Sequence, residues 1–573
     1  MPVRNAEIAD LLDELADLLD IEGANAFRVR AYRNAARTIR GHAKSMAELV
    51  AAGADLSELP GIGKDLAAKI ETIVATRRLP LLEEVAARTP RALSELMKIQ
   101  GLGPKRVKTL YRSLKVRSLD DLRRAAIAGR IRELPGFGAK TETLIREGIE
   151  RRVALESRMS LKAAEEIAGP LVAWLERCPG VKRVAVAGSY RRRKETIGDL
   201  DILVTATRDS PVIDRFAHGE DIAEVVSRGK TRSTVRLRSG VQVDLRVVPE
   251  VAYGAALQYF TGSKDHNIAV RKIAAKKGLK INEYGVFRGS KRVAGRTEAE
   301  VYAEIGLPVM PPELREDRGE VEAARKGKLP ELVELEAIRG DLHCHTSASD
   351  GHDSLEAMAR AAAARGYAYV SVNDHSKHVT VANGLDEKRL RAQLDAIDAL
   401  NERLDDIVVL KSVELDILED GSLDLPNRIL EKLDFTVCAI HYQLGLSRER
   451  QTERVLRAMD NPHFSILAHP TGRLINDRPA YAIDLEKVMR GAKERGCYLE
   501  LNAQPSRLDL TDEACRLAKE LRLKIAISTD AHSGGDLDLM RFGIDQARRA
   551  WLTADDVVNT RDLASLRKLL ARR

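Results

Sequence analysis

The stretch VAVAGSYRRRKETIGDLDILV, residues 184–204, constrains the fold more than any other part of the chain. An apolar run ends at Gly188-Ser189, a basic cluster follows, and Asp199 and Asp201 open a second apolar run. Residues two apart on a strand point to one face of a sheet, so these two carboxylates should project together. An isolated pair of this kind is more often a solvated strand end than a site. A third acid, Asp244 in the strand-like run VQVDLRVV, instead predicts a divalent-metal site on adjacent strands.

Length and charge divide the chain. At 573 residues it is too long for one hydrophobic core, which predicts several domains. Residues 1–330 carry 60 Lys and Arg against 45 Asp and Glu, whereas residues 331–573 carry 34 against 41 and hold nine of the twelve histidines. We therefore expect the front of the chain to meet a polyanion and the back to hold metal ligands.

The compartment is predicted from what the sequence lacks. It has no apolar run near 18 residues and no signal-peptide pattern, which indicates a soluble protein that is not exported. The five cysteines are few, odd in number and mostly inside apolar runs, as in a reducing cytoplasm. We expect a cytoplasmic protein with no membrane partner.

The first 150 residues read as helical and contain three Gly-x-Gly turns, each running into an amphipathic helix. Such a turn exposes backbone N–H groups that can bind a phosphate without reading a base. A single copy would be an ordinary turn between helices, but three copies with basic neighbours favour phosphate binding. They resemble helix-hairpin-helix DNA-binding motifs. The predicted DNA-binding residues are Gly61, Gly63, Lys64, Gly101, Gly103, Lys105, Arg106, Gly136, Gly138 and Lys140.

The back of the chain repeats one pattern, in which a strand-like apolar run ends in a ligand-type residue. Helical patterns alternate with these runs, which predicts a parallel barrel-like sheet with its site at the carboxyl ends of the strands. Lone histidines are more often structural, and we expect this of His352, His378 and His463. The other ligand-type residues recur too regularly at the ends of these runs to be explained in that way, which predicts a cluster of metal ligands there.

The region around the first two aspartates resembles the palm of family X DNA polymerases. The likeness takes in Gly188-Ser189, Arg192, Asp244 and the run Tyr259–Ser263 in order, and it covers roughly residues 1–310. It implies two Mg²⁺ ions held by Asp199, Asp201 and Asp244. For the aromatic pair that opens the run, core packing is as good an explanation as contact with the nucleotide sugar. The residues that the resemblance implies for nucleotide binding are Gly188, Ser189, Arg192, Tyr259, Phe260, Gly262, Asn267 and Arg271.

Three positions depart from the family pattern. Gln242 stands where the vertebrate enzyme has an arginine near the primer end. Lys69 aligns with the lysine that family members use to remove deoxyribose phosphate. In that basic pocket, however, Asp65 replaces one lysine and Arg28 another, which weakens the expectation of lyase activity.

Residues 338–573 resemble the polymerase and histidinol phosphatase (PHP) domain, a distorted seven-stranded α/β barrel with three metals. By this resemblance one metal is held by His343, His345, Glu414 and Asp530; a second, bridged by Glu414, is held by His441 and His469; and Asp350, His375 and His532 hold the third. Zn²⁺ and Mn²⁺ both suit these ligands. Arg473 is predicted to help bind the phosphate.

The resulting prediction is a multidomain bacterial-type family X polymerase with its own 3′-5′ exonuclease, acting on gapped or nicked DNA with dNTPs in repair. An AP endonuclease activity is a further expectation, and no obligate protein partner is evident. The alternatives are an end-processing phosphoesterase whose polymerase half only positions DNA, and a non-catalytic scaffold. The expected domains are a helical DNA-end-binding domain (1–88), helix-hairpin-helix fingers (89–150), an α+β nucleotidyltransferase palm (151–260), a thumb (261–314), a linker (315–337) and the (β/α)7 PHP barrel (338–573).

Overall fold

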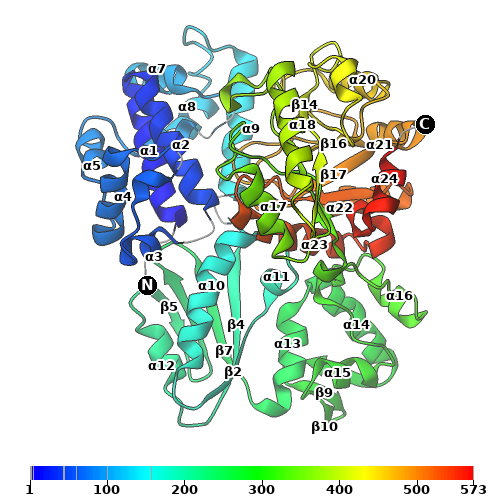
Figure 1. Cartoon of the computed structure of the whole chain (residues 1–573). Coiled ribbons are helices and arrows are strands. Elements are labelled where there is room, and N and C mark those ends of the chain that lie inside the picture. The colour runs from blue at the N-terminus through cyan, green and yellow to red at the C-terminus, as the bar shows by residue number, and fades with distance from the viewer. Residues whose placement is uncertain are drawn as a thin grey trace. The chain divides into compact units, whose positions relative to one another are not determined.

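The computed structural model describes residues 3, 5–42, 45–59, 61–97, 99, 101–155 and 158–571. It divides into two compact units, Met1–Arg158 and Met159–Arg573, which are described separately below (Figure 1). Pro60 and Gln100, which belong to the first two Gly-x-Gly segments, lie outside the described residues. In the described part of the chain no helix is both long and apolar enough to cross a membrane. All five cysteines are buried, and none of them forms a disulfide bond.

The first unit is built from helices around one core. Ile8, Leu12, Leu15 and Leu18 of α1 recur at three- and four-residue steps and are fully buried, so one apolar face of this helix packs on the core. Its helices are α1 (Asn5–Glu22), α2 (Ala26–Gly41), α3 (Met46–Ala51), η1 (Leu56–Glu58), α4 (Lys64–Thr76), α5 (Pro80–Ala86), α6 (Ala92–Met97), α7 (Pro104–Leu114), α8 (Leu119–Ile127) and α9 (Ala139–Leu155).

The second unit begins with a five-stranded sheet in the order β2-β4-β7-β6-β5. Only β4 and β7 run parallel to each other; the other neighbours are antiparallel. α10 packs on β2, and α12 packs on β5, β6 and β7. The elements are β1 (Met159–Ser160), α10 (Leu161–Glu176), β2 (Val181–Val186), α11 (Gly188–Arg191), β3 (Thr196–Ile197), β4 (Asp199–Ala206), α12 (Val212–Ala217), β5 (Ile222–Arg228), β6 (Arg232–Leu237) and β7 (Gln242–Val247).

A helical segment with a small antiparallel sheet follows. The sheet has the order β10-β9-β8 and shares a core with α14, α15 and α16. The elements are η2 (Glu250–Ala252), α13 (Tyr253–Thr261), α14 (Lys264–Lys276), β8 (Leu279–Asn282), β9 (Gly285–Arg288), β10 (Lys291–Ala294), α15 (Glu298–Glu304), η3 (Pro312–Leu314) and α16 (Glu320–Arg325).

The stretch expected to be a linker is folded into this segment over residues 315–328. Arg315 and Glu320 have no exposed surface. The Arg315 guanidinium donates to the Met310 carbonyl at 2.9 Å and to Glu298 at 2.6 Å, and Glu320 lies 2.6 Å from His266 Nδ1. Because each buried charge has a partner, a polar sequence without an apolar face can still pack here.

The remaining strands are all parallel and form two sheets, β11-β12-β13 and β14-β15-β16-β17-β18. Isolated parallel bridges connect the sheets at both ends, from His375 to Glu414 and from Cys344 to Ala531. This arrangement is that of a distorted α/β barrel. Its strands are β11 (Gly340–Asp341), β12 (Tyr369–Val372), β13 (Val408–Lys411), β14 (Glu414–Asp416), β15 (Val437–Ala439), β16 (Ile466–Leu467), β17 (Tyr498–Asn502) and β18 (Ile525–Ser528).

Helices alternate with these strands, as the sequence predicts. They are α17 (Leu355–Ala363), α18 (Glu387–Asn401), α19 (Asn427–Leu430), α20 (Arg448–Met459), α21 (Leu485–Arg495), α22 (Asp512–Glu520), α23 (Met540–Arg549) and α24 (Leu563–Leu570). Short 3₁₀ turns lie between them: η4 (Leu335–Ala337), η5 (Thr380–Ala382), η6 (Gly534–Leu539), η7 (Ala554–Asp556) and η8 (Val558–Thr560).

The sheet β2-β4-β7-β6-β5 and the barrel share a hydrophobic core. Leu508, Leu539 and Phe542 of the barrel belong to the same buried cluster as Leu200 and Leu245 of the sheet. Ion pairs surround this contact: Arg193 binds Asp545 at 2.5 Å, Arg473 binds Glu195 at 2.7 Å, and Arg549 binds Glu316 at 3.1 Å. The two parts therefore form one compact unit.

Candidate active sites

The two central carboxylates of the sheet face each other across neighbouring strands. The parallel register of β4 and β7 pairs Asp201 with Asp244, and it pairs Asp199 with Gln242. Asp199 is exposed, Asp201 is half-buried and Asp244 is 6% exposed. The three predicted acids therefore gather where β4 begins, graded from solvent to interior.

Electrostatics at these acids favour a bound cation. Burial, followed by the charges of Asp199 and Asp244, raises the pKa of Asp201 to about 7. Burial also disfavours the ionised form of Asp244, but hydrogen bonds from Thr234 (2.6 Å), Gln242 (3.0 Å) and Arg232 (3.0 Å) lower its pKa. Crowded carboxylates of this kind repel each other, and oxygen ligands suit Mg²⁺, so the donor set fits this ion.

Gly188 is required by the geometry of the site. Its φ is +61°, and a Cβ built on it would lie 2.5 Å from Oδ2 of Asp201. Any other residue would therefore strain the backbone and displace a carboxylate. Gly188 opens the short helix α11, and Ser189 is half-buried at its second position.

Arg192 is held by partners on other elements. Its Nε lies 3.0 Å from Glu316, and its Nη1 donates to the Thr261 carbonyl at 2.5 Å. Gly262 adjoins it, because a Cβ there would lie 3.2 Å from Nη1 of Arg192. Sequence reasoning did not identify Glu316, whose role depends on a contact 124 positions along the chain.

The aromatic pair of α13 is neither fully buried nor free. Tyr259 and Phe260 make an edge-on contact with ring centroids 5.0 Å apart. Arg271 lies over the Tyr259 ring at 5.2 Å, and Arg246 lies over the Phe260 ring at 4.4 Å. Arg271, which was predicted to bind the nucleotide, therefore lies against this aromatic pair. Arg246 lies against it as well, and the sequence did not predict this.

Asn267 is 6% exposed and its amide is already engaged. Its Nδ2 donates to the Tyr259 carbonyl at 2.7 Å, and its Oδ1 accepts from Gln258 at 2.7 Å. These contacts position the aromatic pair relative to α14.

The Gly-x-Gly turns have the conformations that glycine permits. The first glycines, Gly61, Gly101 and Gly136, have φ of +73°, +89° and +81°. Gly63 and Gly103 are the N-caps of α4 and α7 and provide no side-chain cap. A Cβ at Gly63, Gly103, Gly136 or Gly138 would meet nothing within 4 Å, so these turns face open space. This open side leaves room for a phosphate near the N-termini of the helices that follow.

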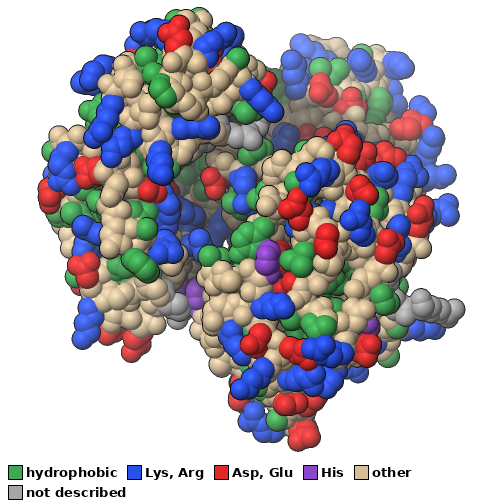
Figure 2. All heavy atoms as spheres, turned by 90° about the horizontal axis from the view of Figure 1, so that it is seen from above, with side chains coloured by type: hydrophobic (Ala, Val, Ile, Leu, Met, Phe, Trp, Pro, Cys, Tyr) green, Lys and Arg blue, Asp and Glu red, His purple; other side chains and the backbone are tan. Residues whose placement is uncertain are grey.

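The basic residues near these turns divide into two kinds. Lys64, Lys105 and Lys140 are exposed. Arg106 instead donates to the Gly101 carbonyl at 2.7 Å and to the Gly136 carbonyl at 3.4 Å, which ties two turns together. On the visible face of the molecule, Lys and Arg side chains are interspersed with Asp and Glu (Figure 2).

Lys69 lies on α4 and forms an ion pair with Asp65, four residues earlier. Asp65, which replaces a lysine of the family pattern, thus places a carboxylate next to Lys69, the candidate lyase nucleophile. An ammonium held as a charged partner is a poorer nucleophile than a free amine.

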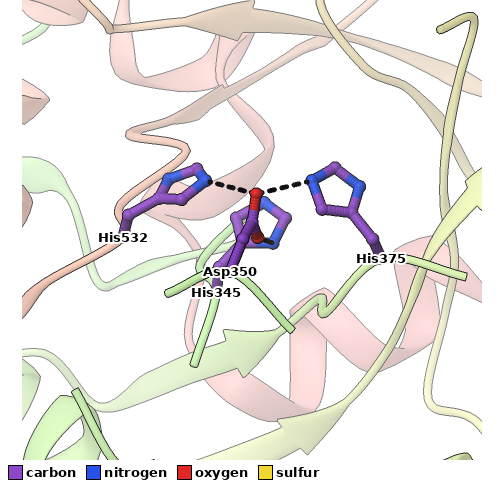
Figure 3. A group of neighbouring side chains, drawn as sticks. All are labelled: His345, Asp350, His375 and His532. Carbon is purple, nitrogen blue, oxygen red and sulfur yellow. Dashed lines mark ion pairs between the residues drawn. The ribbon is translucent and has the colours of Figure 1, made fainter. Parts of the chain in front are cut away.

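The histidine-rich site of the barrel contains all nine predicted ligands. In one group Asp350 lies between His375 and His532, at 3.5 Å and 3.6 Å, with His345 beside it at 3.7 Å (Figure 3). The expected third-metal trio of Asp350, His375 and His532 is therefore brought together, with one histidine added.

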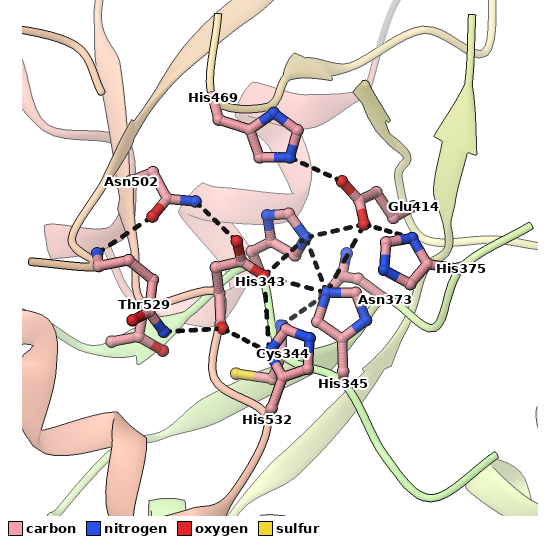
Figure 4. Close-up of polar contacts among 12 residues, drawn as sticks. His343, Cys344, His345, Asn373, His375, Glu414, His469, Asn502, Thr529 and His532 are labelled. Atoms are coloured by element: carbon pink, nitrogen blue, oxygen red, sulfur yellow. Dashed lines mark hydrogen bonds and ion pairs between the residues drawn. The ribbon is translucent and has the colours of Figure 1, made fainter. Parts of the chain in front are cut away.

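The other ligands surround Glu414 and Asp530. Asp530 lies 3.2 Å from Nε2 of His345 and 3.8 Å from Nε2 of His343. Oε1 of Glu414 faces His469 at 2.9 Å and His441 at 3.3 Å, and Oε2 of Glu414 faces His375 at 2.8 Å. Figure 4 shows His343, Glu414 and His469 converging from different strand ends. Glu414 thus contacts histidines of more than one group, as a bridging ligand would.

Several buried atoms in this cluster face other charged groups but form no hydrogen bond with the described residues. Nδ1 of His345 and Oε2 of Glu414 accept no hydrogen bond in the described part of the chain, and Nε2 of His343 and His345 face each other at 3.2 Å. A buried polar atom without a partner is costly. Imidazole and carboxylate donors aimed at one another fit divalent metals with mixed nitrogen and oxygen ligands.

Charge within the cluster is consistent with this arrangement. Burial disfavours the charged forms, but nearby carboxylates raise the pKa of His343 and His375. Against the same effect of burial, Asp350 and Asp530 raise the pKa of His532 to about 9. The histidines in turn hold the pKa of Glu414 far below its usual value, despite its burial.

Supporting carboxylates behind the ligands were missed by sequence reasoning. Glu500 lies 2.7 Å from Nδ1 of His343, and Asp416 lies 3.2 Å from Nδ1 of His441. Such partners fix the orientation of a metal-binding imidazole. Asp416 could have been found, because it is two residues after Glu414 on β14 and shares its face. His378, expected to be structural, also pairs with Asp416.

Arg473 does not face the metal-ligand cluster freely. Its guanidinium pairs with Glu195 of the β3–β4 region at 3.2 Å and 2.7 Å, and it also donates to the Leu508 carbonyl. The expectation that it binds phosphate is therefore not met in this structure. Its partner comes from 278 positions away, which no local pattern indicates.

Comparisons with known proteins agree with these two sites. Residues 163–235 match the DNA polymerase beta palm model and residues 256–316 the DNA polymerase beta thumb model. Residues 3–79 match a helix-hairpin-helix domain, and residues 93–151 match a SAM-like helix-hairpin-helix tandem. The fold and the acidic site define a polymerase of the DNA polymerase beta class that carries a metal-ligand barrel.

Full-length similarity identifies the family. The chain is 36% identical over 570 residues to the DNA polymerase/3'-5' exonuclease PolX of Bacillus subtilis, covering 99% of both chains. The chain therefore belongs to the PolX family. It is also 27% identical over 342 residues to DNA polymerase lambda of Rattus norvegicus, covering 54% of this chain and 56% of that one. A probable phosphatase of Thermoanaerobacter sp. is 32% identical over 241 residues, which cover 40% of this chain and 93% of the phosphatase.

Proposed function

We propose that this protein is a DNA polymerase that fills short gaps during DNA repair and trims 3′ ends with the nuclease site of its barrel. The observation that carries the polymerase half is the cross-strand pair of Asp201 and Asp244 beside Gly188. The nine converging ligands of the barrel carry the nuclease half.

In the polymerase site, Asp199, Asp201 and Asp244 would hold Mg²⁺. A pair of such ions stabilises the attacking and leaving oxygens of nucleotidyl transfer. The chain itself supplies the remaining functions: Ser189 and the N–H groups of α11 orient the triphosphate, and Arg192 donates to it once Glu316 releases its guanidinium. Tyr259 and Phe260 line the space for the sugar of the incoming nucleotide.

In the nuclease site, the three ligand groups would hold Mn²⁺ or Zn²⁺, which supply an activated water and polarise the phosphodiester. Glu500 and Asp416 keep the imidazoles of His343 and His441 in the orientation that ligation needs. The 3′ terminal nucleotide is the substrate, and cleavage at abasic sites is a second activity of the same centre.

The partners proposed for the first unit are gapped or nicked DNA, bound through the phosphate backbone at the open glycine turns. No obligate protein partner is proposed. The likeness to a bacterial DNA polymerase supports a place at the nucleoid in the cytoplasm.

One assay tests both halves and the alternatives. A labelled gapped duplex is incubated with and without dNTPs, using Asp199→Ala with Asp201→Ala and, separately, His343→Ala with His345→Ala. The first double variant should lose gap filling and keep Mn²⁺-dependent 3′ degradation, and the second should do the reverse. Persistent extension by the first refutes the polymerase site, and persistent degradation by the second refutes the nuclease site. If wild type shows only degradation, the protein is an end-processing phosphoesterase, and if it shows neither activity, it is a scaffold.

A further inference from the structure

A second arginine stands where Arg473 was expected to act. Nε of Arg507 lies 3.8 Å from Oδ2 of Asp530, one of the proposed metal ligands. Its side chain is only 22% exposed. Arg507 is held at this place by the turn that begins at Gln504, because Gln504 accepts from the Arg507 N–H at 2.8 Å and donates its own amide to the Asp530 carbonyl at 3.0 Å.

The guanidinium of Arg507 has donors to spare. Within the described residues it makes no hydrogen bond, and its one ion pair is the long contact with Asp530. Oδ2 of Asp530 already accepts from Asn502 at 3.1 Å, and Oδ1 faces the histidines. A guanidinium has five N–H donors in a planar fork that matches a phosphate. The guanidinium of Arg507 is largely buried and has few partners, so it is available to bind an anion.

Arg478 adds a second positive charge on the same side. Its loop is joined to the Arg507 turn by the hydrogen bond from the Ile475 N–H to the Ser506 carbonyl at 2.7 Å. The guanidinium donates to the Gly472 carbonyl at 3.0 Å and 2.7 Å, and in the described chain it pairs with no carboxylate. Partial burial, and then the charge of Arg507, lower the pKa of Arg478. Two guanidiniums that repel each other beside a metal-ligand cluster are stabilised by a shared anion.

We propose that Arg507 and Arg478 form the phosphate-binding subsite of the nuclease centre, with Arg507 holding a non-bridging oxygen of the scissile phosphodiester and Arg478 the phosphate next to it. This proposal rests on the nuclease function proposed above. It replaces Arg473, whose guanidinium is occupied by Glu195. The ligand is the 3′ end of a DNA strand, and the mononucleotide product carries the same phosphate.

The test compares Arg507→Gln and Arg507→Lys with wild type on single-stranded oligo-dT carrying a 5′ label. Loss of a charge-assisted hydrogen bond should raise KM about 10- to 100-fold in Arg507→Gln. We expect kcat to fall much less. Arg478→Gln should raise KM by a smaller factor, and Arg507→Lys should recover part of the loss, because a lysine keeps the charge without the fork. Weakening of competitive inhibition by dTMP should follow the rise in KM.

A matched control is Arg495→Gln on α21, whose side chain is 29% exposed and pairs with Asp460 at 2.7 Å. It should stay within twofold of wild type in every measurement. Bound metal, measured by mass spectrometry, should be unchanged in Arg507→Gln. Unchanged KM and dTMP inhibition in the folded Arg507 variants would overturn the proposal. The proposal would also be overturned if Arg507→Gln lost bound metal and excess Mn²⁺ restored both the bound metal and the KM. Arg507 would then serve only to position the metal ligand Asp530.

The proposed nuclease function can fail separately. If His343→Ala with His345→Ala degrades the oligonucleotide as wild type does, the barrel is not the nuclease, whatever the arginine variants show. If that double variant is inactive while Arg507→Gln and Arg478→Gln match wild type, the nuclease function stands and the phosphate subsite does not.

Discussion

Replacing Gly188 by alanine should damage the polymerase site while leaving the nuclease site intact. The new Cβ would lie 2.5 Å from Oδ2 of Asp201, and ordinary contacts of this kind begin near 3.4 Å. The carboxylate or the backbone must therefore move by about 0.9 Å, and a misplacement of about 1 Å can cost on the order of 100-fold in rate. The left-handed backbone at φ +61° adds about 1–2 kcal/mol of destabilisation.

The assay is kcat/KM for filling a one-nucleotide gap, with 3′ degradation measured on the same preparation. Gly240→Ala is the control, because Gly240 also has a positive φ, +84°, but a Cβ there meets nothing within 4 Å. Both variants should lose a similar amount of stability, and only Gly188→Ala should lose gap filling, by about 100-fold. A Gly188→Ala protein that fills gaps within twofold of wild type would refute the argument that this glycine is needed to seat Asp201.

Three further predictions follow from charged contacts described above. Glu298 bonds to Arg191 and Arg315, and although burial opposes this, the two guanidiniums lower its pKa to about 2. The stabilisation of the folded protein by ionised Glu298 is complete above pH 4.5 and is lost as the pH falls toward 2. Glu298→Gln should therefore lower the free energy of unfolding in urea by about 3 kcal/mol at pH 7 and by much less at pH 3. An equal decrease at both pH values would contradict this. Glu500→Gln removes the carboxylate from His343 and should raise the Mn²⁺ concentration for half-maximal degradation about 10- to 100-fold, with gap filling as the internal control. Because Asp65 pairs with Lys69, borohydride should trap little covalent adduct between wild type and abasic DNA, and none with Lys69→Ala. Asp65→Asn should increase the amount of trapped adduct. Equal amounts with all three proteins would exclude Lys69 as the nucleophile.

Local patterns were enough to predict which acids and histidines the fold brings together. The spacing of Asp199 and Asp201 gives a shared face on any strand, and histidines at strand ends converge in any parallel barrel. Their supports could not be predicted in the same way. Glu195 and Glu316 look like solvated acids in the sequence, and only the packing of distant segments gives them Arg473 and Arg192 as partners.

The same limit explains the misread polar stretch. Arg315 has no apolar neighbours in a helical or strand pattern, so its sequence predicts exposure. In the structure Glu298 and the Met310 carbonyl accept hydrogen bonds from its guanidinium, which lies 5.3 Å from the centroid of the Tyr302 ring. Burial of a charge depends on partners that hydropathy alone does not identify.

The shared core between the five-stranded sheet and the barrel has a consequence for modularity. Phe542 and Leu508 are almost fully buried in a cluster that also contains Leu200 and Leu245. A fragment that stops before the barrel would expose that side of the polymerase core and leave Arg193 without Asp545. The two catalytic halves therefore cannot be exchanged between proteins as independent cassettes, and a descendant that loses the barrel would have to acquire new apolar or helical cover over the sheet before its polymerase half could remain soluble.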